Sequence, residues 1–379
     1  MNHQTGSTPN RLTIFLFAAA SAAGCGGVEP EQPGQQDPAS VATLTQELLA
    51  TAQPATQVTQ RYFPATAPWY QDVSAAAIAP DSSAITSWMV SKSGPNGFGT
   101  GRLRVDFSIV TVDVPAGTAK RTYTADPGYF YSPDCDTAPI PVPAGGASEQ
   151  TYGVTPVFTT PFSAYNCAGF SSGADCHMLF VARAEQRLYE VYHGTIDSGN
   201  AFKTGCLAIW NTSITDPNGR GQQCTSADAA GFPIAPLMFT PEEIQAGQIN
   251  HAIRFILPNS MIRTRKYVAP GTHGTNTTGP STAPPYAARL RLRASYPLST
   301  LSPAARVVAR ALQKYGMLLA DGGNIALTAQ SDVLSSVKWS AVGFDSNSLS
   351  ALKATDFEVI AYGTPKDVTY NCTRTPITR

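Results

Sequence analysis

The sequence predicts a mostly β fold, an antiparallel β-sandwich with two short helices. Several segments alternate apolar and polar residues with a period of two, which is the pattern of strands with one buried face. Only 14% of the 379 residues are charged, while glycine and proline number 31 and 30. Low charge and frequent turn residues are typical of extracellular β proteins. The chain is long enough for one large β domain with a substantial core.

Four segments carry the strand pattern. In residues 103–114 the alternation shifts phase after Ile109, which predicts either a long strand with a bulge or two strands that meet at a corner. Residues 178–192 predict two strands around a turn at 184–186, and residues 206–211 predict a strand before the turn sequence Asp-Pro-Asn-Gly at 216–219. Residues 289–296 alternate again. Asp321-Gly322-Gly323-Asn324 is expected to join 317–320 and 325–328 as a hairpin.

Two helices have recognisable start signals. Thr240-Pro241-Glu242-Glu243 is a capping box with proline at the first helical position, and Gly247 can end that short helix. Ser302 and Pro303 begin a longer helix whose apolar residues form one stripe before Gly316. We expect that stripe to pack on a sheet.

The N-terminus contains a segment typical of export. Arg11 precedes an apolar run over residues 12–23, and Ala22-Ala23-Gly24-Cys25 closes it. The run is shorter than the roughly 20 residues that span a bilayer as a helix, so it predicts a cleaved signal. The sequence that ends at Cys25 resembles the lipobox of bacterial lipoprotein precursors. A secretory peptide with ordinary cleavage is the alternative.

The resemblance to lipoproteins implies an organisation and a location. Residues 1–24 would be a signal peptide, and Cys25 would be lipidated and hold the protein in the membrane. Residues 25–45, rich in Gly, Pro and Gln, are expected to be a flexible tether. Residues 46–379 would form the β-rich ectodomain. Gly26 stands where aspartate signals inner-membrane retention in Gram-negative lipoproteins, so the resemblance implies the outer membrane for such a source.

Six cysteines remain apart from Cys25, an even number that predicts three disulfides in an oxidising compartment. Fifteen pairings are possible in principle. Short loops favour Cys167 with Cys176 and Cys206 with Cys224, which leaves Cys135 to pair with Cys372. No CxxC spacing and no His pair accompanies these cysteines, so we expect neither a metal nor another cofactor.

Charge indicates what the protein binds. The net charge is zero, so nucleic acid is not an expected partner. No acidic residue occurs between Glu243 and Asp321, whereas ten basic residues do. Within this block, Arg289, Arg291 and Arg293 would project from one sheet face at about 7 Å intervals and suit the carboxylate or sulfate groups of a polysaccharide. The alternative is that acids on neighbouring strands neutralise them.

The candidate catalytic residues are histidines and carboxylates at the edges of predicted strands. They are His177, His251, Asp175, Asp228 and Asp321. A histidine base with a carboxylate partner is suited to a glycoside hydrolase or lyase on an extracellular glycan. Each residue also has a structural explanation, as a half-buried histidine or a turn acid. The alternative function is non-catalytic glycan binding on a flat platform of exposed rings: Trp69, Tyr70, Trp88, Trp210 and Trp339.

One further resemblance concerns three short segments of the predicted ectodomain. Residues 225–231, 250–255 and 315–322 are similar to segments of uncharacterised secreted bacterial β proteins. The similar region would extend over residues 175–324. It implies a secreted β protein and no particular activity.

Overall fold

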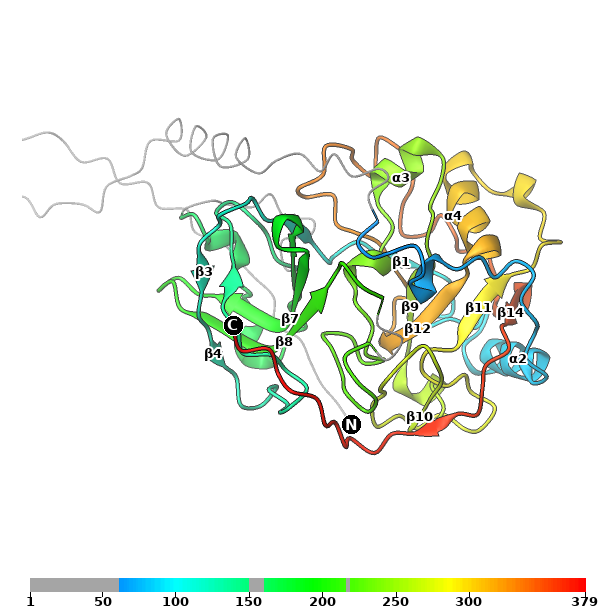
Figure 1. Ribbon diagram of the computed structural model, residues 1–379. Helices are drawn as coiled ribbons and strands as arrows, with labels where there is room; N and C mark the ends of the chain where they lie inside the picture. The colour runs from blue at the N-terminus through cyan, green and yellow to red at the C-terminus, as the bar shows by residue number, and fades with distance from the viewer. Residues whose placement is uncertain (1–60, 150–159, 216–218) are drawn as a thin grey trace, which may run out of the picture.

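The computed structural model describes residues 61–149, 160–215 and 219–379 (Figure 1). The predicted signal peptide, Cys25, the tether and the turn residues 216–218 lie outside the described residues. In the part that the structure describes, the chain is mostly β, with few helices and many loops. The coarse fold class that the sequence predicts is therefore confirmed.

A five-stranded sheet, on the left in Figure 1, has the order β2-β6-β7-β8-β4. The central strands β6, β7 and β8 are antiparallel neighbours, whereas β2 and β4 join the edges in parallel. The strands are β2 Thr111–Asp113, β4 Thr124–Ala125, β6 Met178–Ala182, β7 Arg187–Ile196 and β8 Phe202–Asn211. The predicted strand, turn and strand over residues 178–192 is confirmed. Every residue of β6 is buried, because cores lie on both faces of this sheet.

A six-stranded sheet, on the right in Figure 1, has the order β1-β13-β9-β12-β11-β14. Its strands are β1 Val105–Asp106, β9 Ile253–Leu257, β11 Arg289–Leu292, β12 Met317–Gly322, β13 Leu327–Thr328 and β14 Phe357–Val359. β12 runs parallel to β9, and β1 runs parallel to β13, while the other pairs are antiparallel. Both large sheets are thus mixed, so the expectation of a purely antiparallel arrangement is only partly met.

The predicted hairpin between residues 317–320 and 325–328 is wrong. β12 and β13 do run in opposite directions, but they pair with the two edges of β9 and not with each other. A turn signal reports that the chain reverses locally. It cannot report that a third strand, distant in sequence, fills the space between the two arms.

The phase shift in residues 103–114 marks a passage between sheets. β1 belongs to the six-stranded sheet and β2 to the five-stranded sheet, so the interpretation as two strands at a corner is correct and the single bulged strand is not. Val105 and Phe107 belong to the main core, which contains residues of both sheets, and Val110 and Val112 belong to a second core on the other face of the five-stranded sheet. The shift therefore marks the point where the chain changes cores.

The two predicted helices are confirmed as α3 (Pro241–Ala246) and α4 (Pro303–Lys314). Thr240 and Glu243 form the capping box, and Ser302 caps α4. The sequence did not indicate α2 (Ser82–Lys92), whose N-cap side chain makes no capping hydrogen bond. No helix in the described segments has the length and apolar character needed to cross a bilayer. Short 3-10 turns occupy Pro68–Tyr70, Ser163–Tyr165, Phe170–Ser172, Arg183–Glu185, Ala235–Leu237, Asn259–Met261, Leu298–Thr300 and Ala354–Asp356.

Two small ribbons lie at the edges of the molecule. β3 (Lys120–Arg121) pairs with β5 (Ile140–Pro141), and β10 (Lys266–Tyr267) pairs with β15 (Lys366–Asp367). The second ribbon holds the C-terminal segment against the middle of the chain.

Three disulfides are present, but two of the predicted pairings are wrong. Cys167 pairs with Cys176 as expected, whereas Cys135 pairs with Cys206 and Cys224 with Cys372. The prediction was based on loop lengths, but the pairing depends on tertiary contacts that bring the cysteines together. The backbone N–H of Asp136 donates to the carbonyl of Leu207 at 2.8 Å, which places Cys135 beside Cys206. The N–H of Thr369 donates to the side chain of Gln223 at 2.8 Å, which brings Cys372 to Cys224.

We expect the Cys224→Ser/Cys372→Ser variant to lose about 2–5 kcal/mol of unfolding free energy, because that bond restricts the unfolded chain over 148 residues. Denaturant titration measures this loss. The matched control is Cys167→Ser/Cys176→Ser, which opens a loop of only 9 residues and should cost less. Peptide mapping without reduction checks the connectivity, and a peptide that links Cys206 to Cys224 would contradict it.

Candidate functional site

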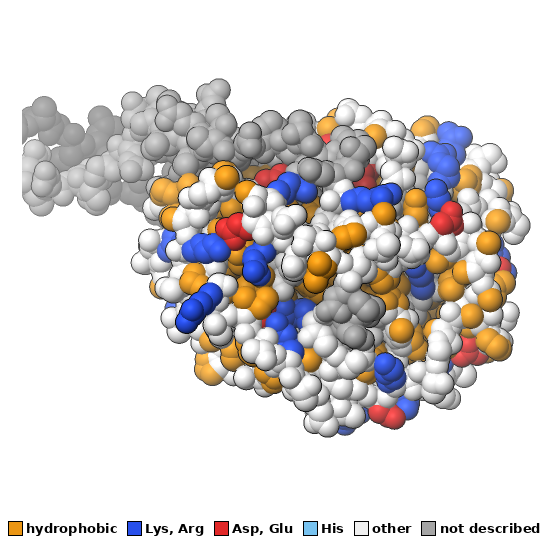
Figure 2. Space-filling view, viewed as in Figure 1, with side chains coloured by type: hydrophobic (Ala, Val, Ile, Leu, Met, Phe, Trp, Pro, Cys, Tyr) orange, Lys and Arg blue, Asp and Glu red, His pale blue; other side chains and the backbone are white. Residues whose placement is uncertain are grey.

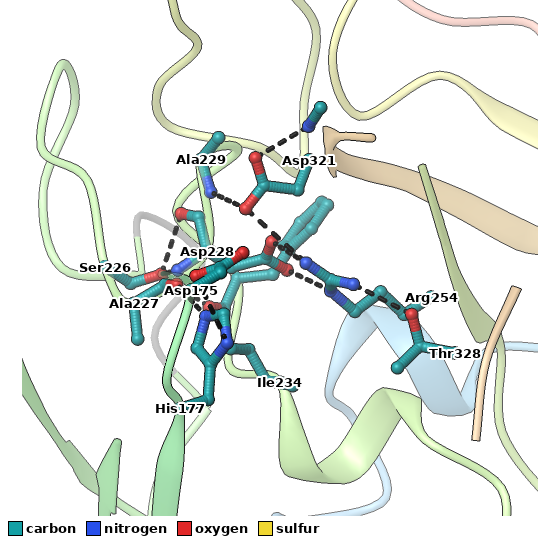
Figure 3. A network of polar contacts seen from close by, with 12 residues as sticks. Asp175, His177, Ser226, Ala227, Asp228, Ala229, Ile234, Arg254, Asp321 and Thr328 are labelled. Atoms are coloured by element: carbon teal, nitrogen blue, oxygen red, sulfur yellow. Dashed lines mark hydrogen bonds and ion pairs between the residues drawn. The ribbon is translucent and has the colours of Figure 1, made fainter. Parts of the chain in front are cut away.

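Four of the five candidate catalytic residues come together at one cleft between the sheets (Figure 3). Asp175, Asp228 and Asp321 line the cleft, which has a volume of about 1080 Å³. Asp175 and His177 precede β6 of the five-stranded sheet, and Asp321 lies near the end of β12 of the six-stranded sheet. Asp228 comes from the segment that connects β8 to β9. The site therefore exists only because the two sheets pack together.

A buried ion pair lies at the base of the site. Arg254 of β9 donates from Nε and Nη2 to the two carboxylate oxygens of Asp228, at 3.2 and 3.0 Å. Its Nη1 donates to the hydroxyl of Thr328 on the neighbouring strand at 2.8 Å. Asp228 is 1% exposed and Arg254 4% exposed, so each charge depends on the other for compensation. Ser226 holds the turn, since its hydroxyl accepts from the N–H of Asp228 at 3.0 Å.

Asp321 shares this arginine and has a raised pKa. Its Oδ2 accepts from Arg254 Nη2 at 3.4 Å and from the N–H of Ala229 at 3.2 Å, and its Oδ1 accepts from the N–H of Gly322 at 2.6 Å. Burial and the negative charge of Asp228 raise the pKa of Asp321 to about 8, against the opposing effect of Arg254. Asp321 is therefore mostly protonated at neutral pH and can donate a proton. The pairing of β12 with β9 shifts register between Leu319 and Asp321.

His177 is held as an imidazolium. Its Nε2 donates to the carbonyl of Ala227 at 3.2 Å, and its Nδ1 donates to the carboxylate of Glu149 at 2.8 Å. Burial disfavours the charged ring, but the carboxylates of Asp175 and Glu149 outweigh it and raise the pKa of His177 to about 10. A histidine that is already protonated cannot accept a proton near neutral pH. This pKa does not favour the predicted role of His177 as a general base and favours a role as a fixed positive charge.

Glu149 is the member of the site that sequence reasoning missed. Its carboxylate accepts from the His177 ring and from the His177 backbone N–H at 2.9 Å, and it also accepts from the Ser108 hydroxyl at 3.1 Å. Burial opposes ionisation, but the charge of His177 prevails and lowers the pKa of Glu149. Glu149 follows β5 in a segment with no strand pattern. No local signal in the sequence distinguishes it from other loop acids.

Asp175 is the accessible carboxylate of the cleft. Its side chain is 63% exposed, and its Oδ1 lies 3.5 Å from Nδ1 of His177. Partial loss of water within the cleft raises the pKa of Asp175, as do Glu149 and Asp228, while His177 opposes them. An exposed carboxylate in the cleft can reach a substrate or a water molecule, as a general base must.

Among the described residues, two groups of side chains have the spacing of metal ligands. Ligand atoms of Glu149, Asp175 and His177 lie within 4.8 Å of one another. A metal there would need the Nδ1 lone pair of His177, which carries a proton and donates to Glu149, so an ion pair explains this group better. The second group is Asp134 with Cys224 and Cys372, and its two sulfurs are already joined in a disulfide.

His251, the other predicted base, does not belong to the cleft. Its Nδ1 donates to its neighbour's carbonyl, that of Ala252, at 2.8 Å, and its Nε2 lies 3.2 Å from Glu243 of α3. Burial disfavours the charge of the ring, yet Glu243 raises the pKa of His251. This pair fastens α3 to the start of β9, which is a structural role.

The side chains of the arginine row are engaged within the protein, and none of them lines the cleft. Arg289 donates to the carbonyls of Tyr315, Pro68 and Gln71. Arg291 and Arg293 share the carboxylate of Glu358 at 2.7 and 2.9 Å. Arg291 also donates to the carbonyls of Val73, Ser74 and Ala76. On the face seen in Figure 2, basic side chains are scattered and do not form a row.

The aromatic platform of the alternative function is not exposed. Trp69, Tyr70, Trp210 and Trp339 are each less than 10% exposed, and Trp88 is half-buried. These rings are part of the main core or pack against it. The exposed rings beside the cleft are instead Tyr131 and Tyr370.

Comparisons of the chain with known protein families, with curated proteins and with solved structures give no match. The chemistry of the cleft is therefore the basis for a functional assignment.

We expect Arg254→Ala to cost about 3–5 kcal/mol of unfolding free energy, because it leaves Asp228 buried without a partner. Chemical denaturation at pH 7 measures the loss. The matched control is Lys203→Ala, which removes an exposed partner of Asp197 and should change stability by less than about 1 kcal/mol. Equal stability of the Arg254→Ala variant and the parent would show that the buried pair is not needed for the fold.

Proposed function

We propose that the protein is a glycan-cleaving enzyme that acts through the carboxylates of this cleft. The observation that carries the proposal is the difference between two acids that line the cleft, Asp321 and Asp175. Asp321 retains its proton near neutral pH, while Asp175 is exposed and lies beside a fixed positive charge. A protonated acid and an ionisable carboxylate in one cleft are the pair that glycoside hydrolysis requires.

The roles follow from the contacts. Asp321 would protonate the glycosidic oxygen as the bond to the leaving sugar breaks. Asp175 would either activate a water molecule or attack the sugar directly. The distance between the two carboxyl groups in the bound complex determines which of these two mechanisms operates. Asp228 and Arg254 hold Asp321. The charge of His177, whose ring is held by Glu149, favours the ionised form of Asp175. Cleavage by elimination, as in a lyase, would use the same two groups as acid and base.

We propose further that the enzyme acts outside the cytoplasm, anchored through a lipid on Cys25. The three disulfides support this location, since such bonds persist in oxidising compartments. The partners are then the membrane, through the lipid, and an extracellular polysaccharide.

We expect Asp321→Asn to lower kcat/KM on a cleaved glycan by about 10²–10⁴, the contribution of a general acid. In the parent enzyme, kcat/KM should fall as pH rises through about 8, because Asp321 then loses the proton that it must donate. A depolymerisation screen with purified protein, followed by a pH profile, measures both effects.

The control for this experiment is Asp197→Asn, an acid that neither lines the cleft nor contacts its carboxylates. His251→Ala, which alters a structural contact, should also keep its activity wherever the protein remains folded. An Asp321→Asn variant with unchanged activity would contradict the proposed acid. Binding of glycans without any cleavage by the parent protein would instead favour the non-catalytic alternative.

A further inference from the structure

The charges that line the cleft are of one sign. Its lining includes the carboxylates of Asp134, Asp175, Asp228 and Asp321, and it includes no lysine or arginine. Arg254 and His177 compensate part of this charge from behind the wall, where each is engaged with carboxylates. Asp321 keeps its proton near neutral pH and Asp228 is paired with Arg254, so the carboxylate most open to a substrate is that of Asp175, and no lysine or arginine is among the described lining residues.

The remaining titratable base in the lining does not change this balance. His273 donates through Nδ1 to the carbonyl of Ala229 at 2.8 Å, and burial lowers its pKa. The ring is therefore neutral at pH 7 and offers no charge to an anionic ligand. Uronic acids and sulfated sugars would be repelled here, which reverses the substrate charge expected from the arginine row.

The cleft also presents exposed aromatic rings. Among the described residues, Tyr131 and Tyr370 are two of the four large hydrophobic side chains that are exposed, at 51% and 48%, and both line the cleft. Tyr370 is held near the Thr225–Ala229 wall by the disulfide between Cys224 and Cys372. Aromatic rings attract cations as well as the apolar faces of sugars.

From the carboxylate lining and these rings we infer that the cleft selects a glycan of amino sugars whose amines are free and protonated. This inference rests on the proposed function and specifies its substrate class. The ammonium groups would bind the accessible carboxylate of Asp175, and the sugar rings would stack on Tyr131 and Tyr370. A glycan with acetylated amines has the same shape but lacks the positive charge, so it provides the matched comparison.

Calorimetry with the Asp321→Asn protein tests the selection without turnover. The probes are a glucosamine hexasaccharide and its fully N-acetylated counterpart, at pH 6 and low salt. We expect the free amine to bind about tenfold more tightly, the contribution of one hydrogen-bonded ion pair. High salt should reduce this difference, because it screens accessible charges.

Adding Asp175→Asn should abolish most of the preference, whereas adding Asp197→Asn should preserve it. Thermal melting verifies that each variant is folded. Equal affinity for the two hexasaccharides, or tighter binding of the acetylated one, would overturn the inference.

Cleavage by the parent protein is measured in parallel on a glucosamine polymer, on its acetylated form and on a uronic acid polymer. Cleavage of either of the other polymers but not of the glucosamine polymer would overturn the inference and leave the proposed function standing. Selective binding of the glucosamine hexasaccharide, without cleavage of its polymer, would support the inference and contradict the proposed function.

Discussion

The buried guanidinium of Arg254 is the constraint on which the rest of the site depends. Arg254 lies on β9, the strand between β12 and β13, and one side chain contacts Asp228, Asp321 and Thr328. Carboxylates rarely lie this deep in a protein unless a cation compensates them. Arg254 donates to Asp228 through Nε and Nη2, and its Nη2 lies 3.4 Å from Asp321. Burial and the charge of Asp228 outweigh this contact and raise the pKa of Asp321.

A second buried cation, His177, lies on the opposite wall of the cleft. The imidazolium of His177 lies between Glu149 and Asp175, and it belongs to the five-stranded sheet as Arg254 belongs to the six-stranded sheet. Each sheet thus brings one positive charge to the boundary, and the acids differ in protonation according to their distance from these charges and from water. Three aspartates of identical chemistry acquire different roles through their surroundings.

A disulfide and the ribbon of β10 and β15 hold the C-terminal segment beside the cleft. Cys224 immediately precedes the wall that carries Asp228, and its bond to Cys372 fastens the last segment of the chain over the cleft. The ribbon of β10 and β15 holds the same segment from the other side. The disulfide restrains the start of this wall at Cys224, and the hydrogen bond from the N–H of Ala230 to the carbonyl of Ala320, at 2.8 Å, restrains its end.

Features that depend on residues close together in the chain could be predicted from the amino-acid sequence. The capping box at Thr240 and the strand periodicity of residues 178–192 are local, since a cap or an alternation is complete within a few residues. The sequence marked Asp175, Asp228 and Asp321 as candidates by their residue type and their position at strand edges and turns. It did not predict that they lie together. Tertiary structure alone decided the pairing of the cysteines, the insertion of β9 between β12 and β13, and the protonation of His177. Those features arise from contacts between segments far apart in the chain, and no local pattern encodes the electric field that such contacts create.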